Sequence, residues 1–471
     1  MSNFNSNNFI QTTLGELVSQ EKKSIISGPF GSNIGKIFFK TEGIPVIRGN
    51  NLSTGGEKFK DQGFVFITRK KADELNCYAI KNDLIFTAVG TIGQVGIIDE
   101  KLKYDEYIIS NKQLRVRFDN NKITPLFAYY WFSSYWIQKL ILQRNVGSTV
   151  PLINLSVLKG LPITLPKSIN VQNKIVEVLE NISLKIELNN RINTELEAMA
   201  KTLYDYWFVQ FDFPTPSPLG RAGEGIPYKT SGGKMVWNEE LKREIPEGWE
   251  AGTIGNYCKS TGGFAFKSSW WSDKGLKVVK IKDIQENNTI NLTDLSFADI
   301  PIDKIGINFL AKPGNVLIAM TGATVGKFAI VPFTAEPLFV NQRVGYFNLG
   351  DNPIEKLPFL INSLNQKYFR EAIFTLASGA AQPNISNEQI NDIQLLSPKK
   401  DLIEKFNAIF SSYYLKILSN QKENQELASL RDWLLPMLMN GQVNVVDVAV
   451  LRQTQDDMLG MVAEASARYE K

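Results

Sequence analysis

The chain of 471 residues contains no histidine and only two cysteines, Cys77 and Cys258. The missing histidine excludes Ser-His-Asp and Cys-His catalytic systems. Two isolated cysteines without histidine do not provide the ligands of a structural zinc site. They also form no disulfide framework, which is typical of a protein from a reducing cytoplasm. We therefore predict no metal site, no cofactor and no catalytic residue, and we expect a cytoplasmic protein.

Other signatures are missing too. The chain has no GxxxxGK[ST] phosphate loop, no GxGxxG motif that opens a helix and no Asn/Asp-Pro-Pro-aromatic methyltransferase motif. The longest apolar stretch, residues 127–142, is shorter than the ~20 residues of a membrane span and is interrupted by polar side chains. The polar start, Met1 to Asn8, does not resemble a signal peptide. Carboxylates are plentiful, so composition leaves a Mg²⁺ nuclease open, although no carboxylate cluster recurs along the chain.

Charge is distributed unevenly. Residues 1–168 contain 21 Lys and Arg against 13 Asp and Glu, a net charge of +8. Residues 246–398 contain 13 against 14, a net charge of −1. A basic first half favours a polyanionic partner such as nucleic acid, while an ordinary charged surface remains the alternative.

The chain contains an internal repeat. Asp83–Gly93 matches Asn315–Gly326 with one inserted residue, and Gly147–Asn154 matches Gly379–Ser386. In the first pair an apolar run ends in a Gly/Thr turn, which is typical of a buried strand that enters a tight loop. The repeat distance is about half of the chain, so the sequence predicts a tandem pseudo-dimer.

Two helical segments repeat as well. Apolar residues and asparagines in both segments alternate in steps of three and four, the spacing of a coiled-coil seam. Antiparallel pairing would place Asn189 opposite Asn420 at the centre, where an Asn pair fixes register at a cost in stability. Parallel pairing also keeps the seam apolar, and two solvated asparagines remain the alternative. The predicted helix-pairing residues are Ile175, Leu179, Ile182, Asn189, Leu196, Leu203, Phe406, Tyr413, Asn420, Leu427, Leu430 and Leu434.

The predicted fold class is α+β, with two β-rich domains, each followed by a long helix. Prolines after Asp212 end the first helix, and Asn440-Gly441 is a good C-terminal cap for the second. A helix is expected near residues 124–143. The predicted boundaries are 1–168 for the first β-rich domain, 169–211 for the first helix, 212–245 for a Gly/Pro-rich linker, 246–398 for the second domain, 399–441 for the second helix and 442–471 for a tail.

This alternation resembles the DNA-specificity subunits of type I restriction-modification systems. The resemblance covers roughly residues 10–441. Its motifs are the turns Gly90–Gly93 and Gly322–Gly326, the segments Gly147–Asn154 and Gly379–Ser386, and the helix ends Leu203–Phe208 and Leu430–Leu435. The individual motifs are short, so the duplicated architecture carries the identification.

The resemblance implies target-recognition domains that alternate with helical spacers paired as an antiparallel coiled coil. Each domain would read one half of a bipartite, gapped site in double-stranded DNA, and the helices would set the gap. Partner subunits would perform the chemistry: two methyltransferase subunits and, where present, restriction subunits. The chain itself would be no enzyme and would contact no membrane.

Base reading requires paired donors and acceptors, such as Arg on guanine and Asn or Gln on adenine. Other side chains contact phosphates and position the protein. The predicted DNA-binding residues are Ser32, Lys36, Arg48, Asn50, Asn51, Thr91, Lys112, Gln113, Arg115, Arg144, Lys267, Lys280, Lys282, Thr324, Lys327, Asn341, Gln342 and Arg343. The alternative is that residues common to both copies maintain the fold and that bases are read where the copies differ. Trp270 and Trp271 could stack on bases or belong to the core.

The helix ends near Trp207 and Trp433 carry more apolar residues than a seam needs, and we predict that they dock partner subunits. Packing against the chain's own β-rich domains is the alternative. Two other readings remain open: a two-domain scaffold for protein or glycan, and a cryptic Mg²⁺ nuclease or methyltransferase. Salt-sensitive DNA binding separates the first from the leading interpretation, and activity of the isolated chain separates the second.

Overall fold

The computed structural model describes residues 8–53, 58–216, 225–377 and 383–443. The chain divides into two compact units. The first unit consists of Met1–Leu184 and Ala428–Lys471, and the second of Lys185–Leu427. Each unit therefore contains one β-rich domain with part of both long helices. The predicted tail lies almost entirely outside the described residues.

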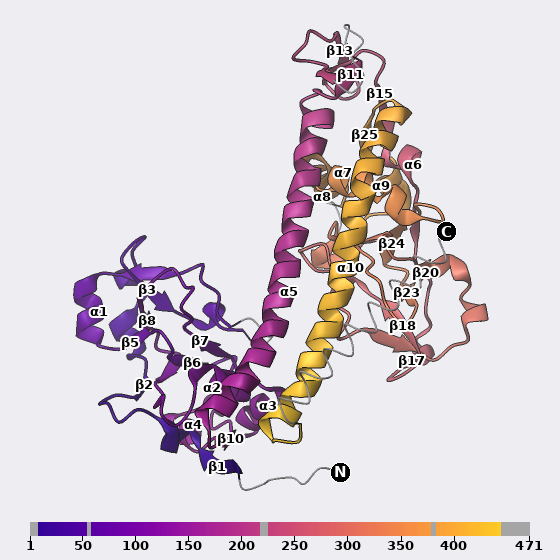
Figure 1. The fold of residues 1–471 in the computed structure, drawn as a ribbon. Helices are drawn as coiled ribbons and strands as arrows, with labels where there is room; N and C mark the ends of the chain where they lie inside the picture. Colours follow the sequence, from indigo (N-terminus) through magenta and orange to yellow (C-terminus); the bar gives the residue numbers. More distant parts are fainter. Residues whose placement is uncertain (1–7, 54–57, 217–224, 378–382, 444–471) are drawn as a thin grey trace, which may run out of the picture. The chain divides into compact units, whose positions relative to one another are not determined.

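Over its described residues, the first unit contains two four-stranded sheets and one strand pair. Their strand orders are β2-β9-β6-β7, β4-β3-β8-β5 and β1-β10. All strand pairs are antiparallel except β3 and β8, which are parallel. The elements are β1 (Phe9–Thr13), β2 (Ile25–Ser27), β3 (Ile44–Ile47), β4 (Val65–Ile67), α1 (Arg69–Leu75), β5 (Tyr78–Ile80), β6 (Leu84–Thr87), β7 (Val95–Ile97), β8 (Glu106–Ile109), β9 (Gln113–Val116), α2 (Pro125–Phe132), α3 (Tyr135–Gln143), α4 (Leu155–Lys159) and β10 (Pro162–Pro166) (Figure 1).

The second unit repeats this plan with one more strand, β17, in its second sheet. Its sheets have the orders β16-β24-β21-β22, β17-β19-β18-β23-β20 and β15-β25, and β18 and β23 form the parallel pair. The elements are β15 (Glu250–Thr253), α6 (Ile254–Tyr257), β16 (Ser260–Gly262), β17 (Trp271–Ser272), β18 (Leu276–Val279), β19 (Ser296–Ala298), β20 (Leu310–Ala311), β21 (Val316–Ala319), β22 (Phe328–Ile330), β23 (Leu338–Val340), β24 (Val344–Phe347), α7 (Leu357–Leu364), α8 (Lys367–Ala377), α9 (Asn387–Asn391) and β25 (Gln394–Ser397).

Hydrogen bonds reproduce the sequence repeat. The amide of Gly90 donates to the carbonyl of Pro151, and that of Gly322 donates to the carbonyl of Pro383, both at 2.9 Å. The strands before these turns, β6 and β21, are buried along their whole length, as their apolar runs predict. The helix expected near 124–143 is two helices, α2 and α3, which break where the Ser134 hydroxyl donates to the carbonyl of Trp131.

The predicted linker, residues 212–245, is folded where it is described. Strand β11 (Pro214–Pro216) pairs with β12 (Gly225–Pro227), and β13 (Met235–Asn238) pairs with β14 (Arg243–Pro246). The Phe213 ring stacks on Tyr228 and Trp249, with centroids 4.7 and 4.9 Å apart. The prolines lie in two-stranded ribbons, where a missing amide donor is tolerated at an edge. Composition alone therefore suggested a less ordered segment than the structure contains.

The two long helices are α5 (Ile169–Tyr204), which continues as a π-helical turn over Asp205–Val209, and α10 (Lys400–Met439). Within the second unit they run side by side and antiparallel (Figure 1). Nδ2 of Asn189 donates to Oδ1 of Asn424 at 2.9 Å, and Nδ2 of Asn420 donates to Oδ1 of Asn193 at 2.8 Å. The antiparallel orientation is thus confirmed.

The predicted register is wrong by about one helical turn, because Asn189 faces Asn424 and not Asn420. The reason is the repeat itself: Asn189 corresponds to Asn420, and Asn193 corresponds to Asn424. The two hydrogen bonds are therefore equivalent under a local two-fold, and they engage four buried or half-buried asparagine side chains and not just two, although the buried Oδ1 of Asn420 accepts no hydrogen bond from the described residues. On the predicted seam, Leu430 is wrong as well, since it is 37% exposed. Buried seam residues are Ile175, Leu179, Ile182, Asn189, Phe406, Asn420 and Leu434, and Leu196, Leu203, Tyr413 and Leu427 are half-buried.

The two tryptophans at the helix ends differ in exposure. Trp207 is 6% exposed and packs with Phe208 against Phe406 in the core of the second unit. At this end the side chains cover the chain's own β-rich domain, so the prediction of a partner-docking Trp207 is wrong. Trp433 is 54% exposed. No helix of the described chain combines the length and apolar composition needed to cross a membrane.

The asparagine layer generates a prediction. Asn420→Leu removes the donor that satisfies the nearly buried Oδ1 of Asn193, and we expect it to lower the free energy of unfolding of the second unit by about 1–3 kcal/mol. The double variant Asn193→Leu/Asn420→Leu replaces both partners and should be more stable than Asn420→Leu alone. Denaturant titration measures both, with exposed Ser419→Leu as the control. A double variant whose loss is the sum of the single losses would contradict this account.

Candidate nucleic-acid interface

Parallel strands place two loops at one edge of each β-rich domain. In the first unit Val46 and Ile47 pair with Ile108 and Ile109. The carboxyl ends of parallel strands lie at the same edge of a sheet, so the segments that follow, 48–52 and 110–113, lie together. The parallel pairing of β18 with β23 places segments 280–284 and 341–343 together in the second unit. These are the segments in which sequence analysis placed most of the base-reading candidates.

One candidate at this edge, Asn51, belongs to the framework. Its side chain is completely buried. Its Oδ1 accepts from the amide of Arg48 at 3.0 Å, and its Nδ2 donates to the carbonyls of Lys60 and Gln62 at 3.0 and 2.9 Å. In the second copy Oδ2 of Asp283 accepts from the amide of Lys280 at 2.8 Å. The same backbone turn is therefore closed by a side chain in both copies.

Gln113 and Arg115 are also buried, at 1% and 4% exposure. In the amide orientation that satisfies its neighbours, Gln113 donates to the carbonyl of Ile47 at 3.2 Å and accepts from the amide of Gly49 at 3.1 Å. Arg115 donates to the carbonyl of Lys23 at 2.7 Å, and burial lowers the pKa of its guanidinium against the opposing effect of Asp83. A duplex cannot reach these atoms, so we withdraw Asn51, Gln113 and Arg115 as DNA contacts. The sequence did not reveal this, because the residue type alone does not distinguish a buried Asn, Gln or Arg from an exposed one.

The remaining candidates of the first unit lie at its surface. Ser32, Lys36, Asn50, Thr91 and Lys112 are exposed. The Thr91 turn is flanked by Gly90 and Gly93, whose φ angles of 95° and 94° favour glycine. The amide of Ala88 donates to the carbonyl of Lys112 at 2.7 Å, so this turn and Lys112 lie close together. Two arginines are already engaged, because Arg48 donates to the carbonyl of Gly63 and Arg144 to that of Gly160.

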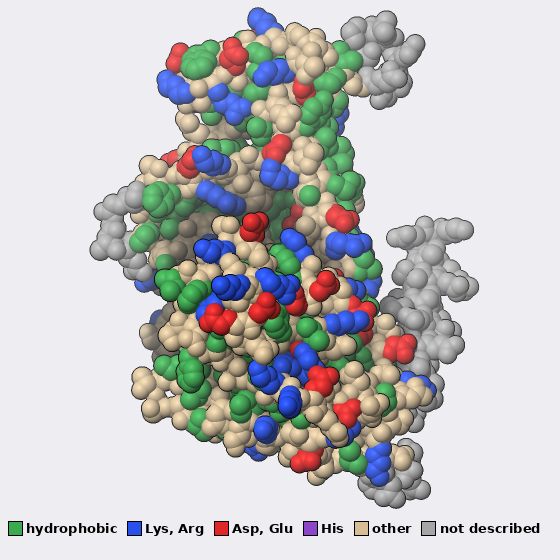
Figure 2. All heavy atoms as spheres, turned by 90° about the vertical axis from the view of Figure 1, so that its left-hand side faces the viewer, with side chains coloured by type: hydrophobic (Ala, Val, Ile, Leu, Met, Phe, Trp, Pro, Cys, Tyr) green, Lys and Arg blue, Asp and Glu red, His purple; other side chains and the backbone are tan. Residues whose placement is uncertain are grey.

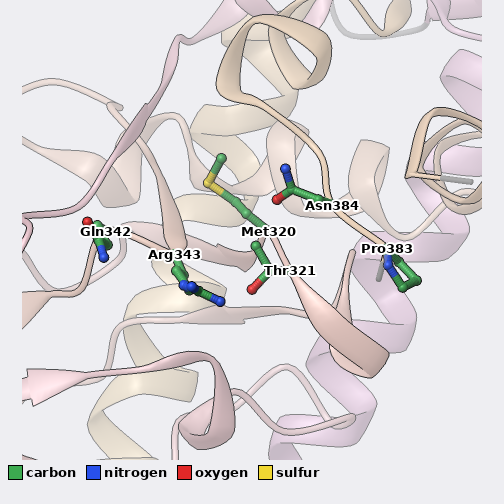
Figure 3. Close-up of a pocket in the computed structure, with 6 residues that line it drawn as sticks. All are labelled: Met320, Thr321, Gln342, Arg343, Pro383 and Asn384. Carbon is green, nitrogen blue, oxygen red and sulfur yellow. The ribbon is translucent and has the colours of Figure 1, made fainter. Parts of the chain in front are cut away.

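In the second unit a pocket of about 360 Å³ opens at the corresponding edge. Figure 3 shows Gln342 and Arg343 on one side, Pro383 and Asn384 on the other, and Met320 and Thr321 between them. Gln342 and Arg343 are exposed, and the guanidinium of Arg343 has no hydrogen-bond or ion-pair partner among the described residues. The buried Oγ1 of Thr321 has no partner there either. Gln342 and Arg343 therefore present exposed polar side chains at the pocket, whereas the unpaired Oγ1 of Thr321 lies inside.

Four other candidates of the second unit are either paired with a carboxylate or half-buried. Lys327 pairs with Glu286 at 3.0 Å, and Lys282 pairs with Asp294 at 2.8 Å. Asn341 and Thr324 are half-buried, the first beside Phe264. Surface pairs of this kind contribute little stability and can exchange for phosphates.

Cation–π contacts gather around the tryptophans. Nζ of Lys280 lies 3.3 Å from the ring centroid of Trp271, and Nζ of Lys267 lies 5.2 Å from that of Trp270. Trp270 stacks on Phe264, whose carbonyl accepts from the amide of Gln342 at 2.9 Å. Both tryptophans are half-buried and pack on the core cluster of Phe266 and Phe339. The cation–π contacts hold the two lysines near the loop that contains Gln342. The rings themselves mainly pack against the core.

On the face shown in Figure 2, the charged side chains do not divide into patches of one sign. On the face that Figure 2 turns toward the viewer, Lys and Arg side chains are interspersed with Asp and Glu. Among the described residues no group of three His, Cys, Asp or Glu is placed to hold a metal ion. What distinguishes the edge described above is its convergence of loops in both copies.

The duplicated domain belongs to a known class. A sequence profile of the family described as type I restriction modification DNA specificity domain matches residues 13–198 and again residues 246–429. The chain therefore belongs to this family and is a specificity subunit of the type I restriction-modification class, as its sequence motifs predicted.

Two relatives support this. The chain is 26% identical over 419 residues to the type I restriction enzyme HindI specificity subunit of Haemophilus influenzae, covering 77% of this chain and 87% of the relative. It is 24% identical over 415 residues to the MjaIX specificity subunit of Methanocaldococcus jannaschii, covering 86% and 88%. The fold matches the crystal structure of the S subunit from M. genitalium with a TM-score of 0.51 at 18% identity, covering 93% of this chain and 98% of that one.

The closed turn at Asn51 gives a prediction. Asn51→Asp keeps the shape but places a carboxylate against the carbonyls of Lys60 and Gln62. We expect a loss of about 1–3 kcal/mol in the stability of the first unit at pH 7. Burial and repulsion should raise the folded-state pKa of the new carboxyl, so its penalty grows as the pH rises above the unfolded value of about 3.9.

Calorimetry at several pH values measures this loss, with exposed Asn50→Asp as the matched control. An Asn51→Asp variant as stable as the control at pH 7 would show that the side-chain contacts of Asn51 do not close the turn.

Proposed function

We propose that this chain selects the DNA sequence for a type I restriction-modification complex and has no catalytic activity of its own. Each β-rich domain reads one half of a bipartite, gapped site. The observation that carries this proposal is the duplicated edge: both copies share buried groups that close the turns, while their exposed side chains differ. A shared framework with different exposed side chains is what two different half-sites require.

Specific contacts follow from the chemistry of base edges. In the second domain the unpaired guanidinium of Arg343 suits the O6 and N7 acceptors of guanine, and the amide of Gln342 suits adenine. In the first domain Asn50 and Lys112 occupy the corresponding loops, with Arg48 beside them. The exposed or half-buried Ser32, Lys36, Thr91, Lys267 and Thr324 remain candidates for phosphate contacts. Five further candidates already have a partner within the protein and would have to release it to contact DNA: Lys280, Lys282, Lys327, Asn341 and Arg144.

We further propose that two methyltransferase subunits, and restriction subunits where present, assemble on the helices. Trp433 and Leu430 are exposed on α10. Met199 on α5 lies 231 residues before Leu430, the same separation as that of Asn189 from Asn420, and is 52% exposed. Equivalent apolar positions on the two helices support two equivalent docking sites. Exposed apolar side chains of this size favour a protein partner over water.

Methylome sequencing tests the proposed function. The chain is expressed with its methyltransferase subunit in a host that lacks DNA methylation, and modified bases are mapped. We expect adenine methylation at one gapped, two-part motif. Arg343→Ala should relax one position of one half-site, worth about 1–3 kcal/mol of discrimination, and leave the other half-site intact. An unmethylated genome from a correctly assembled complex, or a single ungapped motif, would refute the proposal.

A second test concerns the gap. One heptad inserted into both α5 and α10 adds about 10.5 Å of helix, or about three base pairs of B-DNA. We expect a gap longer by that amount and unchanged half-sites in the methylome. Seven residues inserted at Ser231–Gly232, in the folded segment between the helix and the second domain, serve as the control. A gap that stays the same after helix insertion would refute the role of the helices as spacers.

A further inference from the structure

Phe30 is 84% exposed, more than any other large apolar side chain of the described residues. It lies between Ser27, the end of β2, and two 3-10 turns, Gly31–Ile34 and Lys36–Phe38. Ile37 in the second of these turns is 82% exposed. A phenylalanine held in water forfeits the free energy that burial would contribute.

The backbone around Phe30 is held in place on both sides. The amide of Gly28 donates to the carbonyl of Gln113 at 2.9 Å, and a Cβ on Gly28 would lie 1.8 Å from the carbonyl oxygen of Ser110. After Phe30 the amide of Asn33 donates to its carbonyl at 2.8 Å, and Ile34 returns to the core with 5% exposure. Phe30 is therefore presented on a braced turn next to the 110–113 loop.

The second copy differs at this position. Gly263 takes the place of Gly28, with its amide 3.1 Å from the carbonyl of Val344. A 3-10 turn, Ser268–Trp270, follows there too, and the amide of Trp270 donates to the carbonyl of Lys267 at 3.1 Å. The residue whose carbonyl closes the turn is thus Phe30 in the first copy and Lys267 in the second, where the neighbouring Phe266 is 8% exposed. An exposed aromatic side chain at this turn indicates a task specific to the first domain.

The charges around Phe30 indicate which kind of partner its side chain contacts. From Lys22 to Thr41 the chain contains Lys22, Lys23, Lys36 and Lys40 and no Asp or Glu. Exposed Ser32 and Lys36 follow Phe30 within six residues, and exposed Lys112 lies on the loop beside it. Cations that flank an apolar side chain fit phosphates on either side of a base step, whereas an apolar protein interface is depleted of lysine.

We propose that Phe30 is a wedge that inserts between two base pairs of the half-site read by the first domain. This inference rests on the proposed function and deepens it. Apolar side chains inserted in this way unstack the step and kink the duplex, and the energy of unstacking is offset by closer contact with the protein. The first domain then recognises two properties of its half-site: the base edges and the energy needed to unstack one base step.

The test uses the full chain assembled with its methyltransferase subunits and a duplex that carries its motif. 2-Aminopurine is placed in turn at each step of the first-domain half-site, because its fluorescence rises when the base is unstacked. The variants are Phe30→Ala, Phe30→Leu as a partial wedge, and Phe374→Ala as the matched control. Phe374 is a 76% exposed phenylalanine on α8 of the second domain. Lys36→Ala serves as a phosphate-contact reference.

We expect the wild type and Phe374→Ala to raise the fluorescence at one step, and Phe30→Leu to raise it partly. Phe30→Ala should abolish the rise and weaken binding by about tenfold. Its salt dependence should be unchanged, because no charge is lost, whereas Lys36→Ala should reduce the salt slope by about one.

Two outcomes would overturn the wedge while the proposed function stands: Phe30→Ala that unstacks the step as the wild type does, or Phe30→Ala that loses the methyltransferase subunits and keeps its DNA affinity. A wild-type complex that binds its motif no better than unrelated DNA would instead refute the proposed function itself.

Discussion

The parallel pairing of two short buried strands is the constraint on which each β-rich domain depends. β3 with β8, and β18 with β23, bring two segments far apart in sequence to one sheet edge. Because both strands end at that edge, two loops must turn away from it together, and their backbone groups need partners there. Asn51, Gln113 and Asp283 supply those partners from inside. The outer surface of the loops is thereby left free to vary.

The two copies show how much variation this arrangement tolerates. Ile80 donates its amide to the carboxylate of Asp83 at 2.9 Å, and Lys312 donates its amide to the side chain of Asn315 at 2.8 Å. A charged and a neutral side chain thus close the same turn, provided that an acceptor oxygen is present. The helices follow the same rule, since their asparagine bonds are two-fold equivalents. The two copies agree where a buried backbone amide needs an acceptor. They differ where side chains face water.

Much of this fold follows from periodicity. The apolar runs of β6 and β21, the end of α5 before Pro214 and the end of α10 near Gly441 were all predictable, because burial and proline or glycine geometry act locally. The register of the two paired helices was not predictable, because seams shifted by one turn are equally apolar. Only the pairing of the four asparagine side chains distinguishes the two registers. The folded segment 212–245 was concealed by its proline and glycine content. Among the candidate site residues, loop position was predictable, but burial of Asn51, Gln113 and Arg115 depends on contacts with distant segments.

We propose that the loops at the edge of each parallel strand pair form the DNA-contacting surface. Hydrogen–deuterium exchange of the full chain, with and without duplex DNA at low salt, tests it most directly. We expect slower exchange on DNA binding at residues 29–37, 49–50, 90–93 and 111–112 of the first domain and at 342–343 and 384 of the second. Protection confined to elements away from this edge, such as α1 or the β13–β14 ribbon, would contradict it.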